Sequence, residues 1–209
     1  MSRTTKKNPE RKDGFLFLGN QLALDFINTR PVQNGERLEL LPDFSALLRW
    51  YRAAHLISVG VARTLRSRWG ESGRARRMVG AARKLRERLR KEVLAWQCGS
   101  TVSHAMVREL NQLLAAHPMR SRLQSRGNRA ALAPWFRPQR PEDLFAPLAH
   151  SAAALFAEVD PKRIRKCKRC VLHFRDTSKK GTRRWCSMKL CGNRLKVAAY
   201  AARKRRKPR

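Results

Sequence analysis

Hydrophobic residues recur at helical spacing along most of the first 160 residues. The clearest case runs from Gly73 to Gln97, where apolar residues are separated by steps of three or four positions. Basic residues fall on the opposite face, so one side of this helix is expected to be buried and the other solvated. The predicted buried stripe consists of Met78, Ala82, Leu85, Leu89, Val93 and Trp96.

Five further helices are predicted from shorter periodic stretches bounded by residues that favour helix ends. Asn20 and Asp43 are suitable N-caps for the first two. Two more are expected at residues 58–69 and 103–116, and Pro141 opens the last. Together with the long helix, they predict a helical body.

Short β elements are expected at three places. Residues 15–18 and 37–40 are brief strand-like stretches. Residues 122–136 form a candidate hairpin, because Gly127 and Asn128 lie between two short apolar segments. The fold class is therefore mainly α with small β elements.

Three regions follow from this pattern. Residues 1–13 are polar, basic and aperiodic, which predicts a disordered arm. Residues 14–160 are expected to form the helical domain, which ends near Asp160 and Pro161. Residues 161–209 then form a small C-terminal unit of different composition.

Charge separates the chain at the same point. The 209 residues contain 48 Lys or Arg and 15 Asp or Glu, a formal net charge of +33. Residues 1–160 hold 28 basic and 14 acidic residues, whereas residues 161–209 hold 20 basic residues and a single acidic one, Asp176. Such an excess indicates a polyanionic partner, nucleic acid ahead of an anionic membrane surface, which is met mainly by the C-terminal unit.

No stretch of the sequence predicts insertion into a membrane or export. No window approaches the roughly 18 uncharged apolar residues that a membrane-spanning helix needs. The first seven residues lead into charged positions instead of an apolar signal-peptide core. A cytoplasmic, nucleoid-associated protein is therefore expected.

Four of the five cysteines fall within 25 residues in the pattern C-x2-C-x15-C-x4-C. Reduced cysteines at this spacing are typical of a zinc site, in which each thiolate lies about 2.3 Å from the ion. Four thiolates leave no open position, so the sequence predicts one structural Zn²⁺ that drives the folding of a small segment. The predicted ligands are Cys167, Cys170, Cys186 and Cys191.

Other interpretations of the cysteines remain open at this point. They could be unrelated reduced thiols or the ligands of an iron–sulfur cluster. His173 could replace one cysteine as a ligand, although its place in an alternating apolar stretch favours a strand residue. A knuckle, a strand pair and then a helix would make a treble-clef-like finger.

Several motifs in this chain resemble a known family. Phe174–Ser178, Arg183–Met188 and above all Cys191-Gly-Asn-Arg194 resemble the CGNR zinc finger, the C-terminal module of bacterial stress-induced transcription regulators. Residues 18–29, LGNQLALDFINT, resemble the start of the ABATE domain that precedes this finger in the family. The resemblance implies transcription control through DNA binding.

The residues after Cys186 can continue as one helix from about Ser187, an acceptable N-cap, into a basic tail. The major groove of B-DNA admits one helix, where Arg can pair with guanine and Asn with adenine. Most basic residues would instead contact phosphate. Asn193 and Arg194 could equally brace the finger. The candidate nucleic-acid contacts are Arg175, Arg183, Arg184, Asn193, Arg194, Lys196, Arg203, Lys204, Arg205 and Arg206.

The sequence favours a transcription regulator that binds double-stranded DNA through its finger and basic helix. Its helical domain would serve for sensing or dimerisation, with a homodimer and a small-molecule effector as open partners. An RNA- or ribosome-associated zinc protein is the alternative, because a basic module suits any phosphate backbone. No enzymatic activity is expected, because common catalytic motifs are missing from the sequence and the predicted metal site is closed.

Overall fold

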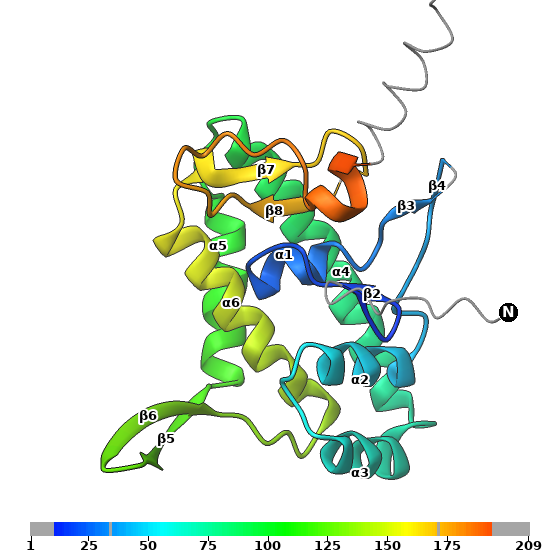
Figure 1. The fold of residues 1–209 in the computed structure, drawn as a ribbon. Coiled ribbons are helices and arrows are strands. Elements are labelled where there is room, and N and C mark those ends of the chain that lie inside the picture. Colours follow the sequence, from blue (N-terminus) through cyan, green and yellow to red (C-terminus); the bar gives the residue numbers. More distant parts are fainter. Residues whose placement is uncertain (1–10, 34, 171, 194–209) are drawn as a thin grey trace, which may run out of the picture.

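A computed structural model describes residues 11–33, 35–170 and 172–193 of the chain. Six α-helices form the body of this part, and the 25-residue helix α4 is the longest of them (Figure 1). No helix within the described ranges is long and apolar enough to cross a membrane. The helices are α1 (Leu22–Ile27), α2 (Phe44–Ala53), α3 (Val59–Trp69), α4 (Gly73–Gln97), α5 (His104–Ala116) and α6 (Phe145–Glu158).

Side-chain caps fix where four of these helices begin. Asp43 accepts a hydrogen bond from the Ala46 N–H at 2.7 Å, as predicted from the sequence. Ser58, Ser72 and Ser103 cap α3, α4 and α5 in the same way. The helices predicted at residues 58–69, 73–97 and 103–116 are thus confirmed.

Helix α1 begins differently from the prediction. Asn20 does not cap it, because the Asn20 backbone is left-handed, with φ of 54°. Gln21 takes the N-cap position without a side-chain hydrogen bond. The Asn20 side chain is instead used in a contact with the C-terminal unit, described below.

The described residues also contain four antiparallel strand pairs. The predicted hairpin is confirmed as β5 (Arg120–Arg126) and β6 (Arg129–Trp135). The other pairs are shorter: β1 (Arg11–Lys12) with β2 (Phe15–Leu16), β3 (Val32–Gln33) with β4 (Glu36–Arg37), and β7 (Ile164–Lys166) with β8 (His173–Arg175).

Two expectations about the N-terminal part need correction. Residues 11–13 are not part of a disordered arm, because Arg11 and Lys12 pair with β2 across a tight turn. The strand expected at residues 37–40 is displaced to β4. Residues 1–10 of the predicted arm lie outside the described residues.

One hydrophobic core joins all six α-helices. The whole predicted stripe of α4 is buried in it, from Met78 to Trp96. Trp50 is fully buried and packs edge-on against Tyr51, with ring centroids 5.2 Å apart. The Tyr51 hydroxyl donates to the Leu144 carbonyl, and burial raises the pKa of this phenol well above its ordinary value. This bond joins the start of α6 to α2 in the core of the domain.

A buried arginine ties α4 to the loop before α2. The Arg86 side chain is 1% exposed and donates to both carboxylate oxygens of Glu39, at 2.8 and 2.5 Å. A third bond of 3.0 Å reaches the Thr29 hydroxyl after α1. Burial opposes ionisation of Glu39, but these bonds from Arg86 hold the pKa of the carboxyl below its ordinary value.

We expect Arg86→Leu to lower the free energy of unfolding by about 2–3 kcal/mol, because it leaves the Glu39 carboxylate without its buried partner. Arg88→Leu is the matched control on the same helix, since Arg88 pairs with Glu109 while 50% exposed. The control should cost no more than about 1 kcal/mol. Urea denaturation of both variants measures the difference, and equal losses would contradict the assigned role of Arg86.

Candidate metal centre and its support on the helical domain

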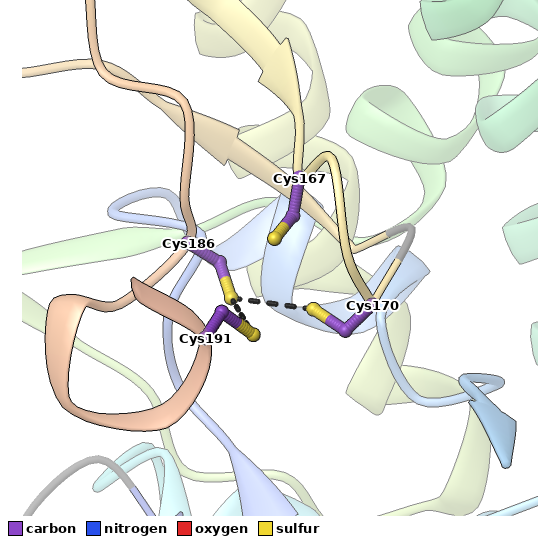
Figure 2. Close-up of side chains that lie close together, drawn as sticks. All are labelled: Cys167, Cys170, Cys186 and Cys191. Atoms are coloured by element: carbon purple, nitrogen blue, oxygen red, sulfur yellow. Dashed lines mark hydrogen bonds between the residues drawn. The ribbon is translucent and has the colours of Figure 1, made fainter. Parts of the chain in front are cut away.

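The four clustered cysteines come from three parts of the C-terminal unit. Cys167 directly follows β7, and Cys170 ends the short turn between β7 and β8. Cys186 ends the long loop after β8, and Cys191 lies in the helical turn η3 (Met188–Gly192). Figure 2 shows their side chains converging on one point. The predicted order of knuckle, strand pair and helix is corrected here: the knuckle lies between the two strands of the pair, and the helical turn follows them.

The spacing of the sulfur atoms suits a single metal ion. All four Sγ atoms lie within 4.8 Å of one another. Cys186 Sγ is 3.3 Å from Cys170 Sγ and 3.6 Å from Cys191 Sγ. A zinc–thiolate tetrahedron with bonds of about 2.3 Å has edges of about 3.8 Å. A disulfide would need about 2.05 Å, so the cluster has the dimensions of a metal cage.

Contacts among the thiols and their burial also change the pKa values of these groups. Cys167, Cys186 and Cys191 are buried. A hydrogen bond from the Cys186 thiol lowers the pKa of Cys170 to about 5. The same contact, together with burial, raises the pKa of Cys186, and burial raises that of Cys191 to about 12. One thiolate is therefore favoured, and a cation is needed before all four can ionise together.

His173 does not join the cluster. It lies in β8 as a strand residue, which confirms the favoured interpretation of its alternating pattern. Its side chain is buried, and neither ring nitrogen has a hydrogen-bond partner among the described residues. Burial, together with the charges of Arg90 and Lys166, lowers the pKa of His173 to about 4, so the ring is neutral near pH 7.

A serine cap and one closely packed glycine hold the helical turn that carries Cys191. Ser187 caps η3 as predicted, since its hydroxyl accepts from the Leu190 N–H at 3.2 Å. Gly192 is packed so closely that a Cβ atom would lie 2.7 Å from Met188 Sδ and 3.2 Å from Trp185 Cδ1. A larger residue at this position of the Cys-Gly-Asn-Arg motif would displace the end of the exposed Met188 side chain and press on the Trp185 ring beside the metal site.

Arg183 and Asp176 organise the loop that leads to Cys186. Arg183 donates to the carbonyls of Trp185 and Cys186, and its guanidinium lies 4.9 Å from the Phe174 ring. Buried Asp176 accepts from the N–H groups of Ser178 and Arg183, at 2.9 and 2.8 Å. Burial opposes ionisation of Asp176, but these bonds keep its pKa below the ordinary value. Arg183, predicted to contact nucleic acid, is thus committed inside the finger.

The other predicted nucleic-acid contacts divide into two groups. Arg184 and Asn193 are exposed, and Arg175 is half-buried at the end of β8. Arg184 lies 5.3 Å from the Trp185 ring and borders a hollow that the sequence did not reveal. That hollow is lined by Gln97, Ile164, Arg165, Lys166, Lys168, Thr182, Arg183 and Arg184. The positions outside the described residues are Arg194, Lys196, Arg203, Lys204, Arg205 and Arg206.

The N-terminal segment that precedes α1 contributes part of the hydrophobic core of the finger. Leu18 packs in the same cluster as Phe174, Cys167, Cys186 and Cys191, apart from the main core. The next two residues, Gly19 and Asn20, continue this contact along the strand β8. The Gly19 carbonyl accepts from the Arg175 N–H at 2.8 Å, and the Asn20 amide donates to the Arg175 carbonyl at 2.9 Å.

A second side-chain amide, from Asn28, forms hydrogen bonds with the edge of β8 that does not pair with β7. Asn28 accepts from the His173 N–H at 2.9 Å and donates to the His173 carbonyl at 2.8 Å, as a neighbouring strand would. Gln97 at the end of α4 donates to the Ile164 carbonyl in β7 at 2.7 Å. The boundary predicted near Asp160 and Pro161 is therefore a change in composition across which the two units are joined by buried hydrogen bonds.

We call residues 18–29 the docking segment. Its contact with the finger was not predicted from the sequence, which indicated only a helix capped by Asn20 and a family resemblance. The available signal was Asn28, a polar residue directly after the buried face of α1, at a position where an amide needs a partner. Gly19 allows the segment to pack closely against the start of α1, because a Cβ atom there would lie 2.9 Å from the Asp25 backbone nitrogen.

A buried carboxyl holds the docking segment in shape. Asp25 accepts from the Gly19 N–H at 2.7 Å and is 8% exposed. Burial raises the pKa of Asp25 to about 7, although the N–H groups of Gly19 and Leu18 and the charge of Lys12 favour the carboxylate. The proton on Asp25 is therefore exchanged close to neutral pH.

Two family models match the chain. Residues 20–159 match ABATE, described as "Putative stress-induced transcription regulator", and residues 163–204 match the CGNR zinc finger. Their order and boundaries agree with the resemblance found in the sequence. A search of curated proteins found no match to this chain.

We expect wild-type protein to bind one zinc ion per chain and Cys186→Ser to lose it, because three thiolates no longer close the cage. The variant should lose the structure of the finger but keep the helical core, with about 2–4 kcal/mol less stability from the broken contacts of the docking segment. Metal analysis and circular dichroism measure both effects.

Cys98→Ser is the control for this experiment, since Cys98 is exposed and outside the cluster. It should keep the full zinc content. A full complement of zinc in Cys186→Ser would contradict the four-cysteine assignment.

We expect Asp25→Asn to remove a pH dependence from the stability. An unfolded Asp has a pKa near 4, so between about pH 4 and pH 7 only the folded protein holds this proton, and the stability of wild type falls progressively across that range and levels off above about pH 7. Asn keeps the acceptor for Gly19 without titrating.

The stability of Asp25→Asn relative to wild type should therefore increase from pH 5 to pH 7, by at most about 1.4 kcal/mol per unit, and level off above pH 8. Urea denaturation across this range measures the difference. A constant difference would show that Asp25 does not titrate as assigned.

Proposed function

The chain belongs to the ABATE family and carries a CGNR zinc finger after its ABATE domain, and we propose that it is a transcription regulator that binds double-stranded DNA through this finger. The helical domain would supply sensing or dimerisation. The proposal assigns the protein no catalytic activity. Cytoplasmic location, in association with the nucleoid, is part of the same proposal.

One Zn²⁺ held by Cys167, Cys170, Cys186 and Cys191 would stabilise the finger. The support is the four converging sulfur atoms, which lie within 4.8 Å of one another, and the burial of three of these cysteines. When bound, the ion supplies structural cross-linking only, since four thiolates leave no coordination position for a substrate. The residues around the cage would then do the binding.

The single observation that carries the proposal is the charge of the finger's surface. Residues 161–193 contain 12 basic residues, and their one carboxyl group, on Asp176, is buried and bonded to backbone N–H groups. Lys166, Lys168 and Arg184 are exposed around the hollow beside the cage. A surface of one charge sign, without acidic residues to oppose a phosphate, suits a nucleic-acid backbone.

Specific recognition would come from the motif that follows the cage. Asn193 is exposed directly after η3, so its amide is available to a base edge. Arg194, Lys196 and the basic run 203–206 continue from it in the sequence. We propose phosphate contacts for the basic run, with Arg175 and Arg184 as further contacts on the finger.

We expect duplex DNA to outcompete structured RNA for the full-length protein at about 150 mM salt. If about 6–10 phosphates are engaged, the logarithm of the binding constant should fall with the logarithm of salt at a slope of roughly −5 to −9. Fluorescence anisotropy with labelled duplex and unlabelled competitors measures both quantities. The reverse order of competition would support an RNA-associated protein and overturn the DNA proposal.

The finger itself is tested by the triple variant Lys166→Gln, Lys168→Gln, Arg184→Gln, which should flatten the salt slope by up to about 3. The matched control is Arg49→Gln, Arg63→Gln, Arg66→Gln, because it removes the same charge from exposed positions on α2 and α3. Equal slopes for the two variants would show that net charge, not the finger, determines binding.

A further inference from the structure

The β5–β6 hairpin has no role in the core of the protein. Its strands are seven residues long, in register from Arg120 opposite Trp135 to Arg126 opposite Arg129. Most of their side chains are exposed. Figure 1 shows the hairpin projecting from the helical body at the end away from β7 and β8. A two-stranded hairpin is marginally stable alone in water, so an arm of this length is expected to meet a partner.

The charge of this segment is entirely of one sign. Residues 118–140 contain six arginines and no Asp, Glu or Lys. Because side chains alternate across a strand and the pairing register is known, four of these arginines share one face of the ribbon. That face, the arginine face, carries Arg120, Arg122, Arg126 and Arg129.

The opposite face carries no charged residue. Leu123 lies directly across from Leu132, and their side chains are 71% and 72% exposed. The remaining positions on this face are Ser121, Ser125, Ala130 and Pro134. The ribbon is thus sharply divided into a cationic face and an uncharged face.

We propose that the hairpin is a second DNA-contacting arm, which lays its arginine face on the phosphates of the duplex that the finger binds. This inference rests on the proposed function. The dimensions fit, because the major groove is about 12 Å wide and admits a two-stranded ribbon. Strands of seven residues reach about 23 Å along it.

The position of the arm allows one duplex to reach both sites. Helix α6 starts after the hairpin and ends before the finger, and its 14 residues span about 21 Å. This length is shorter than one turn of B-DNA, about 34 Å. The two ends of α6 thus lie less than one turn of the duplex apart, with the hairpin before one end and the finger after the other.

A second copy of the chain fits the hairpin less well. The uncharged face measures about 23 Å by 10 Å, far below the roughly 800 Å² that each partner of a stable interface buries. Pairing through this face would leave the arginine faces of both copies without a partner of opposite charge. Charge complementarity therefore favours DNA as the occupant.

The test uses the full-length, zinc-loaded protein and the triple variant Arg122→Gln, Arg126→Gln, Arg129→Gln. We expect its salt slope on duplex DNA to be less steep than wild type by about 3 and its affinity at 50 mM salt to fall by about tenfold or more. Hydroxyl-radical footprinting should show protection lost at one edge of the site and kept under the finger. The α2–α3 triple variant is again the charge-matched control.

The outcomes separate the arm from the finger. If wild type binds duplex DNA and the finger variant weakens it, but the hairpin variant behaves like the control, the arm is refuted and the proposed function stands. If wild type does not prefer duplex DNA, the proposed function itself fails. Sedimentation of Leu123→Ser, Leu132→Ser provides the remaining check: dissociation of a dimer, together with an unchanged salt slope in the arginine variant, would assign the hairpin to self-association and overturn the arm.

Discussion

Strand β8 depends on side-chain amides to complete its hydrogen bonding. Its partner β7 satisfies one edge, and Asn28 and Asn20 from the helical domain satisfy groups on the other. A finger of this size has too few apolar residues to bury such an edge by itself. Leu18 adds the missing apolar contact beside Phe174. The position of the cysteine cage, and of the basic surface around it, therefore follows from twelve residues at the start of the helical domain.

Charge repulsion is the second constraint on this chain, and the structure manages it in two ways. Some arginines are drawn inward and neutralised, as Arg86 is by Glu39, or are bonded to carbonyl groups, as Arg183 is in the finger. Others remain exposed, among them groups on the finger, on the hairpin and on α2 and α3. The first group stabilises the fold, and the second is available to a polyanion.

Local patterns in the sequence were sufficient to predict the elements that depend on local physics. The α4 stripe, the caps Asp43 and Ser187 and the hairpin turn at Gly127 all follow from periodicity or backbone preference. The cysteine spacing likewise predicted the cluster. The role of Asn28 could not be predicted in this way, because its partner, His173, is 145 residues away. The misassigned cap at Asn20 has the same origin, since its amide serves Arg175 instead of its own helix.

The docking segment also bears on how such proteins can be rearranged during evolution. Zinc fingers are commonly regarded as portable units that are exchanged between chains at linkers. Here a transferred segment 161–209 would leave behind Leu18, Gly19, Asn20, Asn28 and Gln97, and with them a side of its core and an edge of its sheet. A recipient would have to supply equivalent groups at the same geometry. The two domains are thus expected to be inherited together, with substitutions in one compensated by substitutions in the other.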